Sequence, residues 1–241
     1  MSFLRFPALF VLFSACLGAQ NPAPAPAAPA PNPEAGFVSI FNGTTLDGWD
    51  GDPKYWRVED GNLVGEITPE TIVKRNTFII WRGGEPADFE LKLEYRVSDK
   101  GNSGLNYRSI QLTDAAWSLA GYQADLDGQD RYNGQNYEER GRTFLALRGQ
   151  TVRLTPGQKP AVLGSLGEPE ALKAVFKPGE WNEYHLVIRG NVLIHTLNGR
   201  VMSVVIDDDP AKARASGLIG VQVHVGPPMK IEYRNIRLKT L

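Results

Sequence analysis

Three stretches of the chain each place two polar residues one position apart within an otherwise apolar, strand-like pattern. The pairs are Asn106 and Arg108, Gln123 and Asp125, and Gln222 and His224. In a β-strand, residues i and i+2 lie on the same face of the sheet. Amide, guanidinium, carboxylate and imidazole groups on one face are typical of a site that binds a sugar or a carboxylate. The sequence therefore predicts a polar ligand site on a sheet. The alternative is the solvated side of an antiparallel sheet.

Histidine offers acid–base or metal chemistry near neutral pH. His224 is the candidate for such a role because it shares a strand face with Gln222. The other two histidines, His185 and His195, are expected to be ordinary residues of two adjacent strands. The three are too widely spaced for a zinc motif and have no thiol partner in the domain.

Clustered aspartates at 125–130 resemble a calcium-binding loop at first sight. An EF-hand requires glycine at the sixth position, whereas here glycine stands at the fourth, so an EF-hand is excluded. A different cation site that uses Asp125 and Asp127 remains a hypothesis. A divalent cation is the one cofactor that the sequence suggests.

Two loop features extend the candidate site. Glu138 and Glu139 precede the segment 140–142, and their carboxylates could reach over the polar strand face or form local surface ion pairs. Among the five tryptophans, Trp117 lies in the polar loop 113–120 and is the candidate for a contact with a sugar at the rim.

Several functions are excluded by what the chain lacks. The sequence has no G-x-S-x-G nucleophile elbow and no Walker or Rossmann phosphate-binding motif. The single cysteine lies near the N-terminus, so the folded part has no thiol for acyl transfer and no disulfide. The net charge is −1 without a basic stripe, which argues against a nucleic-acid partner.

The elements that must position these residues are mostly strands. Alternation is clearest in 88–97, and Asn198-Gly199 between two β-rich runs is a strong hairpin signal. One short helix is expected at 168–176, with Pro169 in its first turn. Further strands are expected at 37–42, 55–59, 63–67, 77–81, 103–110, 121–126, 181–188, 217–225 and 229–239. The pattern predicts an all-β, antiparallel two-sheet jelly-roll sandwich with one short helix and the polar pairs on its concave side.

The N-terminal region has a different character. Residues 1–19 have the features of a secretory signal peptide, with a basic residue, a short apolar run and then small residues. Within them, Cys16 ends a segment similar to a bacterial lipobox, so we expect lipidation there or ordinary cleavage after Ala19. Residues 20–35 alternate proline and alanine and are expected to be an extended linker to a domain at 36–241. The protein is therefore expected to be exported, either as a periplasmic or secreted protein or as an outer-membrane lipoprotein whose only membrane contact is the lipid.

Several segments together are similar to the 3-keto-disaccharide hydrolase family. They are FNGTTLDGW (41–49), NSGLNYRS (102–109), GYQADL (121–126), NYEERGR (136–142), WNEY (181–184), GLIGVQVH (217–224) and EYRNIRLKTL (232–241). The resemblance covers nearly all of the domain, in order. It implies a concanavalin-like or laminin-G-like jelly roll, located in the bacterial envelope or secreted, that acts on oxidised sugars.

This resemblance implies an enzyme that cleaves the glycosidic bond of 3-keto glycosides or disaccharides. A base would remove the acidified C2 proton, the leaving group would depart from C1, and water would then add. Asp125 or His224 is the expected base, Arg108 or a cation the group at the enolate oxygen, and Glu138 the acid. Substrate binding is assigned to Asn106, Gln123, Gln222 and Trp117. The alternatives are a non-catalytic carbohydrate-binding module on an envelope tether, and a sandwich that binds a protein partner.

Overall fold

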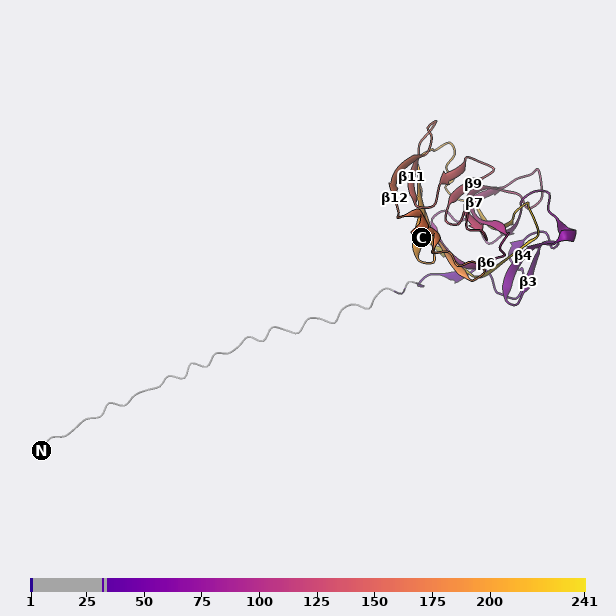
Figure 1. Cartoon of the computed structure of the whole chain (residues 1–241), viewed down its shortest axis with the longest axis horizontal. Helices are drawn as coiled ribbons and strands as arrows, with labels where there is room; N and C mark the ends of the chain where they lie inside the picture. The colour runs from indigo at the N-terminus through magenta and orange to yellow at the C-terminus, as the bar shows by residue number, and fades with distance from the viewer. Residues whose placement is uncertain (2–31, 33) are drawn as a thin grey trace. The chain divides into compact units, whose positions relative to one another are not determined.

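Two β-sheets packed face to face make up the fold of residues 36–241, which form one compact unit in the computed structural model (Figure 1). The structure describes residues 1, 32 and 34–241. The expected signal peptide, Cys16 and nearly all of the expected linker lie outside the described residues. None of the described helices is long and apolar enough to span a membrane.

The two sheets differ in size, and we name each by the number of strands it contains. The ten-stranded sheet has the order β12 (Ala161–Ser165), β11 (Gln150–Leu154), β15 (Arg200–Asp207), β14 (Val192–Leu197), β13 (Asn182–Arg189), β6 (Phe89–Val97), β17 (Met229–Thr240), β4 (Asn62–Ile67) and β3 (Trp56–Glu59), with β1 (Val38–Ser39) also paired to β17. The seven-stranded sheet has the order β10 (Thr143–Ala146), β9 (Asn136–Glu139), β8 (Leu119–Asp127), β7 (Asn102–Gln111), β16 (Leu218–Val223), β5 (Thr77–Trp81) and β2 (Trp49–Asp50).

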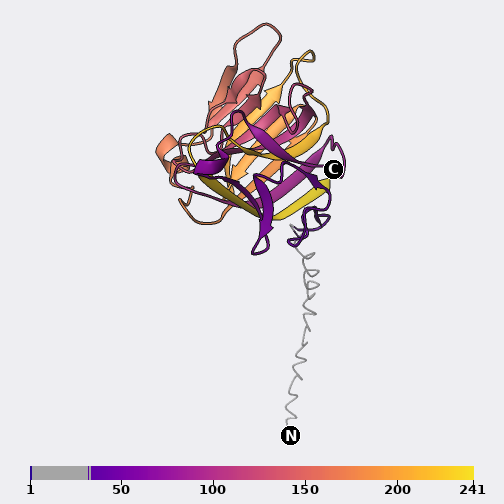
Figure 2. The ribbon, with the colours of Figure 1, turned by 90° about the vertical axis from the view of Figure 1, so that its right-hand side faces the viewer.

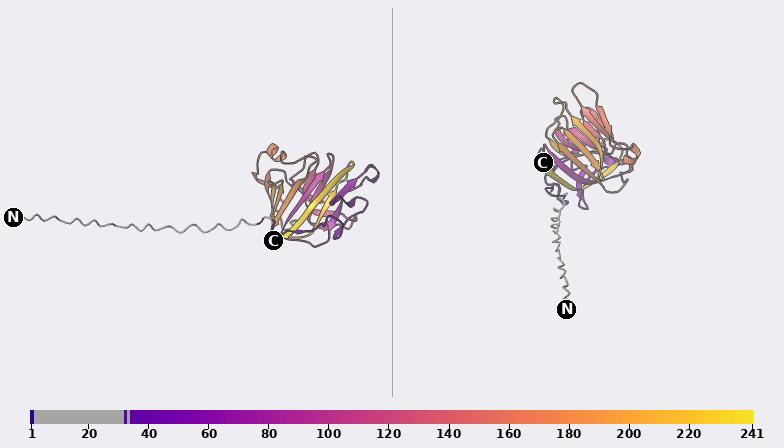
Figure 3. Two further views of the ribbon diagram at one scale, coloured as in Figure 1. Left: turned by 90° about the horizontal axis from the view of Figure 1, so that it is seen from below. Right: turned by 90° about the vertical axis from the view of Figure 1, so that its left-hand side faces the viewer.

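Strand pairing is antiparallel, apart from the parallel pair β11–β15. The chain returns repeatedly to the same sheet, so strands far apart in sequence become neighbours. Figures 2 and 3 show the yellow strand β17 in the same layer as strands from the first half of the chain, and β17 pairs with both β4 and β6. The all-β, antiparallel two-sheet sandwich predicted from the alternation is confirmed.

Most of the predicted elements are present. The Asn198-Gly199 turn joins β14 to β15, and the helix α1 (Pro169–Lys173) begins at Pro169 but is shorter than expected. A single 3₁₀ turn, η1 (Pro69–Thr71), was not predicted. Strands β9 to β12 were also missed. β12 is exposed along its whole length and β9 is mostly polar, so neither shows apolar alternation.

The core lies between the sheets and is built by inward-facing residues of both. Leu91, Leu93 and Tyr95 of β6 are fully buried, as are Tyr107 of β7 and Ala124 of β8. Burying a large apolar side chain contributes about 1.5–3 kcal/mol. The alternation in these strands therefore fixes which face of the seven-stranded sheet remains outside the core.

A histidine joins the two sheets within this core. His195 of β14 lies 2.9 Å from the hydroxyl of Tyr107 through Nε2 and 3.2 Å from the hydroxyl of Tyr184 through Nδ1. Complete burial lowers the pKa of His195 to about 3, so its imidazole is neutral at physiological pH. His185 lies on the neighbouring strand β13, which confirms that the two histidines belong to adjacent strands.

The face predicted for Arg108 is wrong. A bulge between Tyr107 and Ile110 interrupts the pairing of β7 with β8, and Arg108 takes a φ of +43°. The bulge reverses the alternation, so the side chain of Arg108 leaves the face of Asn106. It is 2% exposed and donates hydrogen bonds to backbone carbonyls far apart in sequence, at Ala87, Gly190 and Arg214, and to the carboxylate of Asp88.

We expect Arg108→Met to lower the free energy of unfolding by on the order of 3 kcal/mol, because the buried carbonyl groups lose their donor. Urea unfolding followed by fluorescence measures this. The matched control is Arg153→Met, which removes a half-exposed arginine paired with Asp208 and should change stability by about 1 kcal/mol or less. An Arg108→Met protein as stable as the control would contradict the structural role.

Candidate active site

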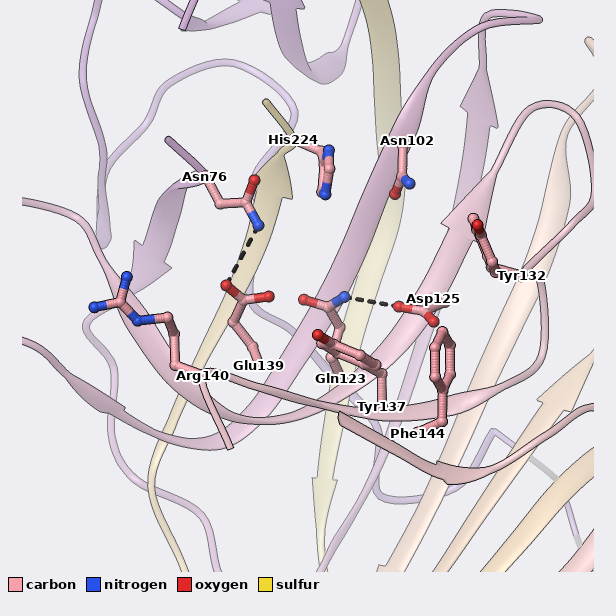
Figure 4. Close-up of a pocket in the computed structure, with 10 residues that line it drawn as sticks. All are labelled: Asn76, Asn102, Gln123, Asp125, Tyr132, Tyr137, Glu139, Arg140, Phe144 and His224. Carbon is pink, nitrogen blue, oxygen red and sulfur yellow. Dashed lines mark hydrogen bonds between the residues drawn. The ribbon is translucent and has the colours of Figure 1, made fainter. Parts of the chain in front are cut away.

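A pocket of about 420 Å³ opens on the outer face of the seven-stranded sheet (Figure 4). Strands β7, β8, β9 and β10, the loops that follow β8 and β9, and the residues that flank β5 and β16 supply its lining. The lining residues are Asn76, Asn102, Gln123, Asp125, Tyr132, Tyr137, Glu139, Arg140, Phe144 and His224. The pocket therefore combines two carboxyl groups, three amides, a guanidinium, an imidazole and three aromatic rings.

A row of side-chain hydrogen bonds runs under the pocket. Gln222 of β16 donates from Nε2 to Oε1 of Gln123 at 3.1 Å, and Gln123 donates from Nε2 to Oδ1 of Asp125 at 2.7 Å. Strands β16, β7 and β8 are consecutive in the sheet, so side chains on one face can bridge them. The row fixes the amide orientation of Gln123 and holds the carboxyl group of Asp125 in place.

Burial raises the pKa of Asp125 to about 7. The neighbouring charges of Glu139 and Asp127 add to this effect, and the hydrogen bond from Gln123 opposes it. A carboxyl group that titrates near neutral pH can both donate and accept a proton during a reaction.

Glu139 provides a second carboxyl group in the same pocket. Burial raises its pKa, and the hydrogen bond from Asn76 Nδ2 at 3.3 Å and the charges of His224 and Arg140 oppose the shift. The Nδ1 atom of His224 lies 2.6 Å from the carbonyl oxygen of Val225. An imidazole can only donate to a carbonyl, so Nδ1 carries a proton and Nε2 is left for a ligand or a proton.

One wall of the pocket is aromatic. The rings of Tyr132 and Phe144 stack with centroids 6.2 Å apart, and Tyr137 meets the edge of Phe144 at 5.1 Å. Phe144 is 43% exposed. Exposed rings beside polar groups are suited to the apolar face and hydroxyl rim of a sugar.

The structure brings Gln123, Asp125 and His224 together in the pocket, as the strand pattern predicted. Gln222 is fully buried behind Gln123 and contacts the site through it. Asn106 is also fully buried and donates to the hydroxyl of Ser109 at 3.3 Å, so it does not line the pocket.

Glu138 lies on the face opposite to the one expected. It accepts hydrogen bonds at 2.7 Å from the backbone N–H and from Nε of Arg142, and Arg142 also pairs with Asp207. Alternation along β9 places Tyr137 and Glu139 on the pocket side and Glu138 on the other. Tyr137 and Glu139 show the same i, i+2 spacing as the three polar pairs, a signal that could have identified them.

Trp117 lies outside the pocket. Its Nε1 donates to Oδ1 of Asp50 at 2.7 Å, and its ring packs against the small apolar cluster of Phe78, Ile80 and Leu119. The residue takes a φ of +50°, which turns the side chain toward β2 and β5. The aromatic contribution expected from Trp117 is available instead from Tyr132, Tyr137 and Phe144.

The residues do not fit the divalent cation that the sequence left open as a hypothesis. The carboxylate of Asp127 is fully buried and accepts from the backbone N–H of Arg131 at 2.7 Å and from its Nε at 3.1 Å. Among the described residues, no three His, Cys, Asp or Glu side chains converge closely enough to hold a metal ion. Asp127 therefore organises its loop, and Asp125 lacks partner ligands.

Solved structures with similar folds include sugar-binding proteins. A proposed glycosyl hydrolase from Parabacteroides distasonis matches 86% of this chain and 94% of its own, with a TM-score of 0.54 and 23% identity. A carbohydrate-binding module from Bacillus subtilis matches 80% of this chain and 96% of its own, with a TM-score of 0.52 and 14% identity. A galectin-like protein of unknown function from Bacillus subtilis gives 0.53 at 14% identity, over 81% of this chain and 90% of its own. These matches show the jelly-roll fold.

The sequence itself identifies a family. A 3-keto-disaccharide hydrolase from Bacteroides thetaiotaomicron is 31% identical over 192 residues, which cover 68% of this chain and 56% of the relative. The chain thus matches little more than half the length of that relative. The model of the 3-keto-alpha-glucoside-1,2-lyase-like domain matches residues 36–239. Because that match spans nearly all of the compact unit, the chain belongs to the 3-keto-alpha-glucoside-1,2-lyase-like domain family.

Proposed function

We propose that this protein cleaves the glycosidic bond of 3-keto glycosides by removal of the C2 proton, elimination and hydration. One observation carries the proposal: two carboxyl groups with raised pKa values, Asp125 and Glu139, line one pocket together with hydrogen-bond donors and aromatic rings. The family of the chain supports the same substrate class.

The chemistry follows from the keto group at C3, which acidifies the hydrogen on C2. A base removes that proton, and the electrons of the C–H bond form an enolate. Collapse of the enolate forms the C1–C2 double bond and breaks the bond from C1 to the leaving oxygen, which takes up a proton. Water then adds to C1 and a proton returns to C2, so the net reaction is hydrolysis. This route avoids the oxocarbenium-like transition state of ordinary glycosidases.

The order of the side chains across the pocket suggests their roles. Arg140, Glu139, Gln123 and Asp125 follow one another along the pocket in Figure 4. Glu139 is the proposed base at C2, and the cationic Arg140 beside it stabilises the enolate oxygen. Asp125, with a pKa of about 7, is the proposed acid for the leaving oxygen. Arg108 and Glu138 take no part, because their side chains lie outside the pocket.

A carbohydrate-binding function without catalysis is the second candidate. The aromatic wall of Tyr132, Tyr137 and Phe144 favours it, as does the fold shared with a carbohydrate-binding module. Binding of a keto sugar without its turnover would distinguish this candidate from the enzyme.

Replacing either carboxyl group should abolish most of the turnover. We expect Asp125→Asn and Glu139→Gln each to lower kcat for a 3-keto disaccharide by about 100-fold or more, since general acid–base groups contribute about 10²–10⁴-fold. Released monosaccharide is measured by chromatography. Glu180→Gln, at an exposed carboxylate outside the pocket, is the control and should retain activity. Full activity in both pocket variants would exclude these roles.

The raised pKa of Asp125 also affects stability. The folded protein holds the proton of the Asp125 carboxyl group more tightly than the unfolded chain does. Ionisation of Asp125 therefore costs no stability below about pH 4, and the cost grows with pH until it is complete above about pH 7. Asp125→Asn lacks the titration and should gain stability relative to the parent as the pH rises from 4 to 8. Urea unfolding across this range measures the difference. A difference that stays constant with pH would show that Asp125 titrates normally.

Isotope exchange tests the elimination route. In deuterated water, the keto sugar released from the cleaved glycoside should carry deuterium at C2, because the proton there is removed and replaced from solvent. Mass spectrometry and NMR detect it. The unoxidised parent disaccharide should remain intact, since its C2 hydrogen is not acidic. Equal cleavage of both sugars without deuterium at C2 would rule out the mechanism.

A further inference from the structure

A second cavity, of about 380 Å³, adjoins the active-site pocket. The two cavities share three lining residues, Asn102, Tyr132 and His224. In Figure 4, Asn102 and His224 lie on the side of the pocket away from Tyr137 and Phe144. The shared residues form the boundary between two halves of one groove.

The two halves differ in charge. The first holds the carboxyl groups of Asp125 and Glu139, whereas the lining of the second includes Lys100 and Arg131 and no carboxylate. Arg131 forms an ion pair with the buried Asp127, but the side chain of Arg131 is 51% exposed. Lys100 is exposed and forms no ion pair with any carboxylate in the described part of the chain. The second half is therefore cationic.

The wall between the halves is preorganised. The guanidinium of Arg131 lies 5.2 Å from the centre of the Tyr132 ring, and the Tyr132 ring also stacks with Phe144. Tyr132 is held by both contacts at the point where the two cavities meet. A ring-shaped group that crosses the boundary can pack against it while Asn102 and His224 supply hydrogen-bond donors and acceptors.

We propose that the second cavity binds the leaving group, and that the favoured leaving group carries a carboxylate. This inference rests on the proposed function, because it places the keto sugar over Asp125 and Glu139 and the breaking C1–O bond near Asn102 and His224. The proton from Asp125 goes to the departing oxygen, and the product is a hydroxyl compound whose carboxylate faces Lys100 and Arg131. A uronic acid or an aromatic acid is a substituent of this class.

The test uses two synthetic substrates of nearly equal size, the 3-keto-α-glucosides of 4-hydroxybenzoate and of 4-hydroxybenzamide. The first carries a carboxylate where the second has a neutral amide. Their leaving groups differ in intrinsic reactivity, so the ratio of the two kcat/KM values is compared between proteins. We expect Lys100→Met to reduce the carboxylate-to-amide ratio by about threefold to fivefold, as the loss of one exposed ion pair would. Lys159→Met, at an exposed lysine outside the groove, should preserve the parent ratio.

Salt provides an independent readout. Adding 0.5 M sodium chloride should reduce the ratio in the parent and change it little in Lys100→Met, since salt screens exposed charges. If both substrates are cleaved and neither Lys100→Met nor salt changes the ratio, the cationic subsite is wrong and the proposed function stands. If the parent cleaves neither substrate, the proposed function fails and this inference fails with it.

Discussion

Strand β8 is buried on both of its faces, and the organisation of the candidate active site depends on this constraint. Tyr122, Ala124 and Leu126 point into the core, and Gln123 and Asp125 lie between them on the pocket side. A strand with strict two-residue alternation cannot shift by one position without exchanging these sets. The same five residues therefore determine both the packing of the sandwich core and the placement of the Asp125 carboxyl group in the pocket.

Burial also sets the protonation of the key groups. It lowers the pKa of His195 and raises those of Asp125 and Glu139, because in each case the charged form loses hydration. The results differ with position. His195 lies between the sheets and becomes a neutral hydrogen-bonding residue of the core. Asp125 and Glu139 lie in an open pocket, where a carboxyl group with a raised pKa can exchange protons with a ligand.

The sequence predicted the sandwich and half of the site because both depend on alternation. Gln123, Asp125 and His224 were found in this way, since Gln123 and Asp125 lie in a regular part of β8 and His224 directly follows the regular end of β16. The face predicted for Arg108 was wrong because a bulge follows Tyr107, and no residue type in the segment indicates a bulge. Glu138 was chosen over Glu139 because the short strand β9 has no apolar alternation to set its phase. The aromatic wall was missed because Tyr132 and Phe144 meet only through the tertiary fold.

Adjacent positions in β9 serve the scaffold and the site. Glu138 pairs with Arg142 beneath the sheet, and Glu139 lies in the pocket. Because the two residues have the same charge and nearly the same burial, only their phase along the strand distinguishes them. A shift of β9 by one residue in register, with no change in composition, would turn Glu139 away from the pocket and Glu138 away from Arg142.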